Sequence, residues 1–242
     1  MTGPRIYSSE TLIPGQQVAL DEQAVTHLVR VLRMQSGDTF RLFNGDGHEY
    51  SASLLVESKK YASAIIGEIL RSDAAMPLAL HLGQVMSKGD RMDFTVQKAT
   101  ELGIREITPL SSERCDVRLK GERMDKKREH WQRVAISACE QSGRNSIPVI
   151  HDPVNLSDWL TAVEADRKLL LHPHNQKPLN SDEQPQSVAI LVGPEGGFSD
   201  PEVMLCQQQG FDGLLLGPRI LRTETAALTA LSVIQYVWGD FR

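Results

Sequence analysis

The sequence lacks the features of several common protein classes. It has 3 cysteines among 242 residues, widely spaced and without a CxxC pair, so neither a disulfide framework nor a zinc site is indicated and we expect no metal. Cys115, Cys139 and Cys206 are expected to be small buried apolar residues. No apolar run is long enough to cross a bilayer and no apolar signal core opens the chain. We therefore expect a cytoplasmic protein without a membrane partner.

Positive charge is also scarce. The formal net charge is −5 at pH 7, which argues against a protein that coats nucleic acid through bulk charge. The charge is uneven, however: residues 114–133 contain eight Lys or Arg against four Asp or Glu, and residues 152–202 contain nine acids against three bases. A locally basic surface suits docking on one chosen RNA site, and a solvated helix face explains the same charges equally well.

Two regions differ in hydrophobic period. Short alternating segments before residue 72, with one helical period at Val25, Leu28, Val29 and Leu32, predict a small β-barrel domain over 1–72. Over 73–242 strands alternate with helices, and the apolar runs 169–171, 188–192 and 214–216 are typical of a parallel sheet covered on both faces. This predicts an α/β second domain. Its predicted helices span 91–102, 124–141, 156–164 and 225–238.

The loop Gly193–Ser199 follows the apolar run 188–192. Its glycines permit a backbone path close to a ligand, and Ser199 opens a helix with a Ser-x-x-Glu capping box that ends at Gly210. Neither Walker A nor GxGxxG is present, and Glu195 would repel phosphates. If the loop binds a ligand, a nucleoside without phosphates is favoured. A tight turn between strand and helix, with no ligand, explains the same residues about equally well.

A second loop, 216–226, precedes the apolar last helix. It concentrates charged and hydroxyl side chains beside apolar neighbours, so Arg222 and Glu224 are expected to form a fixed network or to face a ligand. Thr223 is the expected helix N-cap. A third strand end, Leu171-His172-Pro173, carries a histidine that is more often structural than catalytic.

These loops carry a family resemblance. Gly193-Pro194-Glu195-Gly196-Gly197, paired with the segment 216–226 (LGPRILRTETA), resembles the signature of the ribosomal RNA small subunit methyltransferase E family, in the SPOUT superfamily. Segments 84–89, 97–103, 112–115 and 138–145 are also similar to that family, as are His27 and Val31-Leu32-Arg33. The likeness covers essentially the whole chain.

The resemblance implies a fold and a function. It implies a PUA-like RNA-binding barrel over 1–72 and, over 73–242, a SPOUT-type parallel sheet with a C-terminal deep trefoil knot. It further implies S-adenosylmethionine as cofactor, a homodimer, and N3-methylation of a uridine in the decoding region of 16S ribosomal RNA within the 30S subunit. The alternatives are a SPOUT methyltransferase acting on transfer RNA or a ribose 2′-OH, and a non-catalytic RNA-binding assembly factor.

Candidate site residues follow from the loops and the resemblance together. Glu195 and Glu224 are candidate bases for the N3 proton, and Arg222 or Arg144 would stabilise the uracil anion. Candidate cofactor-binding residues are Leu171, His172, Gly193, Pro194, Glu195, Gly196, Gly197, Leu216, Gly217, Pro218, Ile220, Leu221, Arg222, Thr223, Thr225 and Ala226. Candidate RNA-binding residues are Arg30, Arg33, Lys59, Lys60, Arg114, Arg118, Lys126, Lys127 and Arg128.

Overall fold

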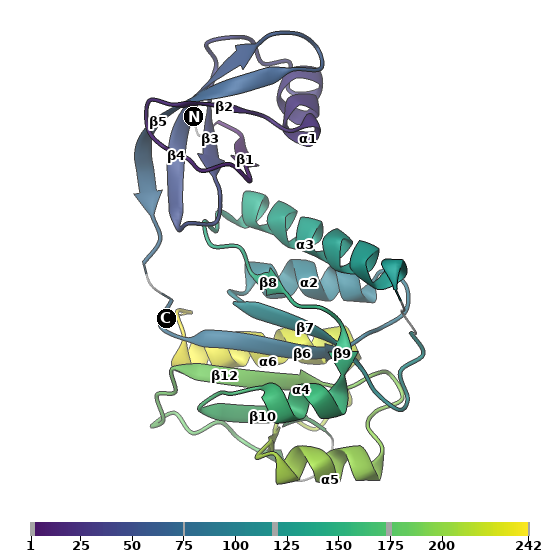
Figure 1. Cartoon of the computed structure of the whole chain (residues 1–242). Helices are drawn as coiled ribbons and strands as arrows, with labels where there is room; N and C mark the ends of the chain where they lie inside the picture. The colour runs from purple at the N-terminus through teal and green to yellow at the C-terminus, as the bar shows by residue number, and fades with distance from the viewer. Residues whose placement is uncertain (1–2, 75, 118–120, 173–175, 242) are drawn as a thin grey trace. The chain divides into compact units, whose positions relative to one another are not determined.

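The computed structural model of the chain describes residues 3–74, 76–117, 121–172 and 176–241. The described residues form two compact units (Figure 1). One unit holds residues 3–74 together with Cys139–Ile147, and the other holds the rest. No described helix is both long and apolar enough to span a membrane.

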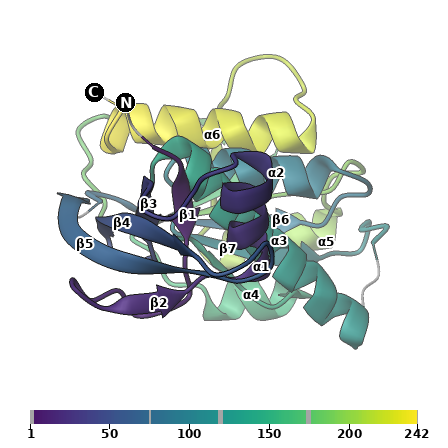
Figure 2. The same cartoon turned by 90° about the horizontal axis from the view of Figure 1, so that it is seen from above.

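The first unit is a five-stranded mixed sheet with a short helix. The strand order is β1-β3-β4-β5-β2, and every neighbouring pair is antiparallel except β1 with β3. The bounds are β1 Arg5–Tyr7, β2 Gln17–Ala19, β3 Thr39–Phe43, β4 His48–Val56 and β5 Ala62–Ser72. The predicted helix is present as α1 (Glu22–Val25), which the Asp21 side chain caps, and a π-helical continuation, Thr26–Val31. Figure 2 shows α1 beside the strands.

The second unit is built on an eight-stranded parallel sheet, as predicted. Seven strands follow the order β11-β13-β10-β12-β6-β7-β8, and β9 pairs with β7. The strands are β6 Ala79–Val85, β7 Glu106–Ser111, β8 Val149–Ile150, β9 Val154–Asn155, β10 Arg167–Leu171, β11 Gln176–Lys177, β12 Ser187–Val192 and β13 Asp212–Leu214. The helices are α2 Arg91–Glu101, α3 Glu122–Ser142, α4 Leu156–Ala162, α5 Asp200–Gln208 and α6 Thr223–Trp238.

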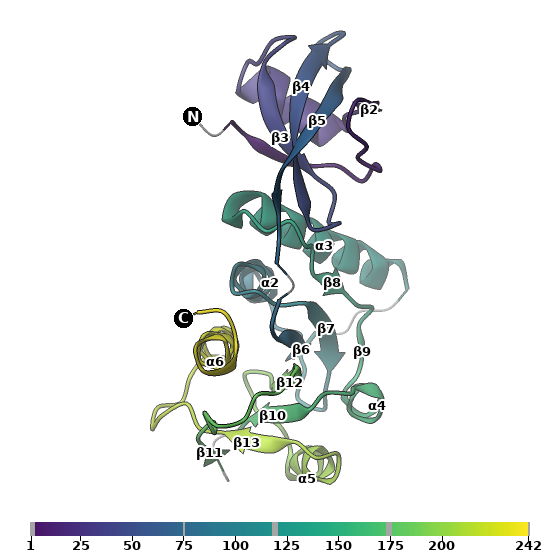
Figure 3. The same cartoon turned by 90° about the vertical axis from the view of Figure 1, so that its left-hand side faces the viewer.

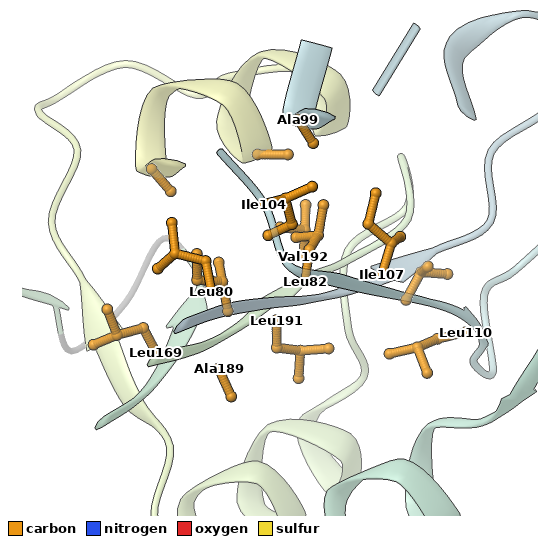
Figure 4. Close-up of a cluster of buried hydrophobic side chains, with 14 of the residues drawn as sticks. Leu80, Leu82, Ala99, Ile104, Ile107, Leu110, Leu169, Ala189, Leu191 and Val192 are labelled. Atoms are coloured by element: carbon orange, nitrogen blue, oxygen red, sulfur yellow. The ribbon is translucent and has the colours of Figure 1, made fainter. Parts of the chain in front are cut away.

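Helices cover both faces of this sheet. α2 and α6 lie on one face, and α4 and α5 lie on the other (Figure 3). The strand side chains therefore meet an apolar layer on each side: Ala189 and Leu191 point to one face and Val192 to the other (Figure 4), and all three are buried. This explains why β12 is apolar along nearly its whole length.

Candidate functional site

Three parallel strands end at the same edge of the sheet. β12 ends at Val192 and β10, its neighbour, at Leu171, while β13 pairs with the other side of β10. The loops predicted to carry function follow these ends. The predicted strand 214–216 is wrong in its bounds, because β13 ends at Leu214. Leu215 and Leu216 instead open the loop before α6.

A cavity of about 520 Å³ lies at this edge, between the end of β10 and the loop before α6. Most of its lining is apolar or backbone, which suits a small molecule held by shape and by main-chain groups. It brings together many of the candidate cofactor-binding residues, but none from the glycine loop 193–197. Its lining residues are Leu171, His172, Gln176, Leu214, Leu215, Leu216, Gly217, Pro218, Arg219, Ile220, Leu221 and Ala226.

The glycine loop leads into α5 with the predicted cap. The carboxylate of Glu202 accepts from the backbone N–H of Ser199 at 2.9 Å, completing the capping box, and Gly210 ends the helix with φ +82°. Within the loop, Gly197 has φ +68°, which favours glycine. A Cβ on Gly193 would lie 2.9 Å from the Phe198 ring, so this position has no room for a side chain.

Thr223 joins the two loops. Its hydroxyl donates to the carbonyl of Gly193 at 2.8 Å and accepts from Nε2 of Gln84 at 2.9 Å. The prediction that Thr223 caps α6 is therefore wrong. Arg222 is the N-cap residue, and the Thr223 hydroxyl is hydrogen-bonded to Gly193 and Gln84. Gln84, at 1% exposure on β6, had no assigned role from sequence, although a glutamine inside a strand of apolar residues is itself a signal.

Two arginines brace the glycine loop from outside. Arg114 donates to the carbonyl of Gly196 at 3.0 Å and approaches that of Phe198 at 3.5 Å, and Arg91, the first residue of α2, forms an ion pair with Glu195. Arg114 was predicted to contact RNA, and Arg91 was not singled out. Arg114 thus holds the backbone of the glycine loop, and Arg91 holds the side chain of Glu195.

The candidate catalytic residues do not all gather in one place. Glu195 and Glu224 line a second hollow in the same unit, of about 710 Å³. Arg222 is exposed, and no ion pair among the described residues joins it to Glu224. Arg144 belongs to the first unit, where its backbone carbonyl accepts from Arg5 at 2.6 Å.

The candidate RNA-binding residues fall into two groups. Arg30, Arg33, Lys59 and Lys60 are exposed on the first unit, and Arg30 donates to the carbonyl of Lys59 at 3.1 Å. On α3, Lys126 and Arg128 lie 3.6 and 3.0 Å from Glu122 and Asp152, and Lys127 lies over the Trp131 ring. Arg118 and Pro173 lie outside the described residues.

A histidine–glutamate cluster occupies the opposite edge of the sheet, where the strands begin. Nε2 of His151 lies 2.8 Å from Glu106, and Nε2 of His81 lies 2.8 Å from the hydroxyl of Thr108. Burial lowers the pKa of His81 to about 4, despite the nearby Glu106 carboxylate. We therefore expect His81 to be neutral in the folded protein at neutral pH.

The comparisons with known proteins agree with this geometry. Residues 74–235 match the model of an RNA methyltransferase domain, and residues 20–67 match that of an RNA methyltransferase PUA domain. The ribosomal RNA small subunit methyltransferase E of Buchnera aphidicola (Schizaphis graminum strain) is 37% identical over 98% of this chain and 97% of its own. That of Bacillus subtilis is 34% identical over 88% of each chain.

Two solved structures match the chain over nearly its full length. A putative methyltransferase of Legionella pneumophila, in complex with bound S-adenosylmethionine, is 45% identical with a TM-score of 0.94 and full coverage of both chains. A ribosomal RNA small subunit methyltransferase E of Neisseria gonorrhoeae, bound to S-adenosylmethionine, is 41% identical with a TM-score of 0.93, covering 99% of this chain and 100% of that one.

Proposed function

Because the chain belongs to the ribosomal RNA small subunit methyltransferase E family, we propose that it methylates N3 of a uridine in the decoding region of small-subunit ribosomal RNA. Its cofactor is S-adenosylmethionine. One observation carries the proposal. The 520 Å³ cavity and the glycine loop, which Thr223 and Arg114 hold by hydrogen bonds, both lie at the carboxyl ends of the parallel strands.

The residues present fit this cofactor. The cavity volume falls within the range of about 300–1,000 Å³ typical of small-ligand sites, and its lining is mainly leucine and backbone, as an adenosine requires. Gly217 has φ +90° and leaves the loop backbone accessible. The side chains of Leu171 and Leu221 would cover the ring, and main-chain groups of residues 216–221 would bind its polar edge. S-adenosylmethionine supplies a methyl group already activated on a sulfonium.

The protein itself must remove a proton and exclude water. Uridine N3 carries a hydrogen and lies on the Watson–Crick edge, so the base has to be unpaired and inserted into the site. We assign the acceptance of that proton to Glu195 or Glu224, which both line the second hollow. We assign the stabilisation of negative charge on the uracil oxygens to Arg222 or Arg144.

A direct experiment tests the reaction. The protein is incubated with radiolabelled S-adenosylmethionine and small subunits from cells that lack the modification, and the labelled nucleoside is then identified. We expect N3-methyluridine at a single decoding-region position. Label in transfer RNA, on a ribose, or in no RNA would overturn the proposal. Arg222→Ala and Glu195→Ala should keep the fold and lose methyl transfer; near-normal turnover in both would remove these residues from the mechanism.

We extend the proposal to the cellular setting and the assembly. The protein would act in the cytoplasm on 30S subunits, as a homodimer with a C-terminal trefoil knot. The knot is part of the proposal because the resemblance to the SPOUT superfamily implies it. The composition of α6 supports a dimer, because apolar side chains remain on its outer side: Leu228, Val233 and Val237 are only half-buried, and Tyr236 is 65% exposed. Sedimentation equilibrium at twice the monomer mass of 26.9 kDa is expected.

A further inference from the structure

The second hollow of the larger unit lies beside the glycine loop and is separate from the 520 Å³ cavity at the end of β10. Its volume is about 710 Å³, and its walls come from the loop after β6, the start of α2, the glycine loop and the start of α6. The first turn of α6 lines both spaces, with Ala226 in the cavity and Glu224 in the hollow. A molecule in the hollow would thus be a near neighbour of one in the cavity. Its lining residues are Lys88, Gly89, Asp90, Arg91, Phe94, Asp116, Glu195 and Glu224.

Phe94 gives the hollow a flat apolar surface. It is the one aromatic residue in the lining, and at 44% exposure it is far more open than an aromatic side chain on the inner face of α2 would be. Unpaired RNA bases are commonly held by stacking on such rings. Stacking alone is tolerant of base identity, so any choice between bases has to come from the polar groups around the ring.

Those polar groups alternate in sign. Lys88 pairs with Asp116 at 2.8 Å, and Arg91 pairs with Glu195. Oε2 of Glu224 is buried and accepts no hydrogen bond from any described residue. A buried carboxylate oxygen without a donor is costly, and because Glu224 lines the hollow, rotation of its carboxyl group would let it accept from a molecule bound there.

A uracil provides that donor in a matching arrangement. Its Watson–Crick edge presents an acceptor, a donor and an acceptor: O4, N3–H and O2. The lining of the hollow holds the Glu224 carboxylate and two cationic side chains, Lys88 and Arg91, so it can supply the acceptor and the donors that complement this edge. Cytosine presents a lone pair at N3, which would face the carboxylate and be repelled. We propose that the hollow receives the acceptor uracil, with Phe94 stacking on the base, Glu224 accepting from N3–H, and Arg91 or Lys88 donating to its carbonyl oxygens. This assignment rests on the proposed function.

The test separates base binding from cofactor binding. Phe94→Ala is compared with Phe241→Ala, whose ring is 42% exposed but lies outside the hollow. With small subunits as substrate, we expect Phe94→Ala to lower kcat/KM by about tenfold or more, in line with the loss of one stacking contact. The Kd for S-adenosylmethionine, measured by calorimetry, should stay unchanged, and Phe241→Ala should match the wild type in both readouts.

Base discrimination is measured without turnover. The protein is loaded with S-adenosylhomocysteine, and saturation-transfer NMR compares the binding of uridine and cytidine. Wild type should prefer uridine, and Glu224→Gln, whose amide can donate to the cytosine N3, should lose that preference. If wild type produces N3-methyluridine but Phe94→Ala keeps its kcat/KM, or Glu224→Gln keeps the preference for uridine, this assignment is overturned and the proposed function stands. If wild type methylates a different nucleoside, the proposed function falls, and this assignment with it.

Discussion

At the scale of single residues, Arg114 holds the glycine loop through its guanidinium group. Its guanidinium binds the carbonyls of Gly196 and Phe198, and such charged hydrogen bonds contribute about 1.5–3 kcal/mol each when well formed. Because Arg114 is exposed, we take the lower end and expect Arg114→Ala to raise the Kd for S-adenosylmethionine about tenfold. Calorimetry measures this, with the exposed Arg123→Ala as control. A normal cofactor Kd with weakened RNA binding would instead return Arg114 to the RNA-contact role predicted from sequence.

The half-buried His81 side chain predicts that the fold loses stability in acid. Its pKa is lowered by burial to about 4 in the folded chain, against about 6.5 when unfolded. The folded state therefore resists protonation, so His81 stabilises the fold fully above pH 6.5 and this contribution is lost as the pH falls toward 4. The loss amounts to at most about 3 kcal/mol. Urea denaturation at pH 7.5, 5.5 and 4.5 measures it.

A matched substitution isolates the effect of His81. We expect His81→Gln to flatten the pH dependence of the free energy of unfolding between pH 6.5 and 4. An unaltered slope in the His81 variant would show that other groups govern acid unfolding.

At the scale of elements, hydrophobic period predicted most of the parallel sheet. The apolar run 188–192 became β12 because both faces of that strand are covered, and the Ser-x-x-Glu pattern placed the start of α5 correctly. A strand was expected at 214–216, but β13 ends at Leu214 and the next two leucines line the cavity. The sequence could not show this difference, because an apolar run is equally typical of a buried strand and of a cavity wall. The roles of Gln84 and Arg91 could not be predicted, because their partners are remote in the chain.

The bond from Thr223 couples three elements, β6, the loop after β12, and α6. Thr223→Val keeps the shape but leaves the Gly193 carbonyl and one Gln84 donor hydrogen without this partner. We expect a loss of about 1–3 kcal/mol in the free energy of unfolding, measured by urea denaturation, and weaker cofactor binding. Thr223→Ser restores the hydroxyl and should recover most of the loss. Equal stability of the valine variant and wild type would mean that water replaces the threonine hydroxyl.

At the scale of the whole molecule, the first unit is assembled from two distant stretches of chain. Arg5, at 7% exposure, binds Glu49 at 2.6 Å, and its other donors go to the carbonyls of Cys139 and Arg144 and to the side chain of Asn145. These partners lie in the segment Cys139–Ile147, which comprises the last turn of α3 and the residues that follow it. A buried guanidinium that loses its acceptors is costly, so this segment is integral to the unit.

A fragment of residues 1–75 should therefore be unstable on its own. Breaking a buried ion-paired network costs about 3–5 kcal/mol, a large part of the stability of a small domain. Joining residues 139–147 to the fragment through a flexible linker should restore a cooperative urea transition, followed by circular dichroism. The same linked peptide with Asn145→Ala loses the acceptor for Arg5 and the hydrogen bond from the Asn145 side-chain amide to Asp73, so it should restore less. If the fragment 1–75 unfolds at the same urea concentration with and without the linked segment, the first unit is complete without it.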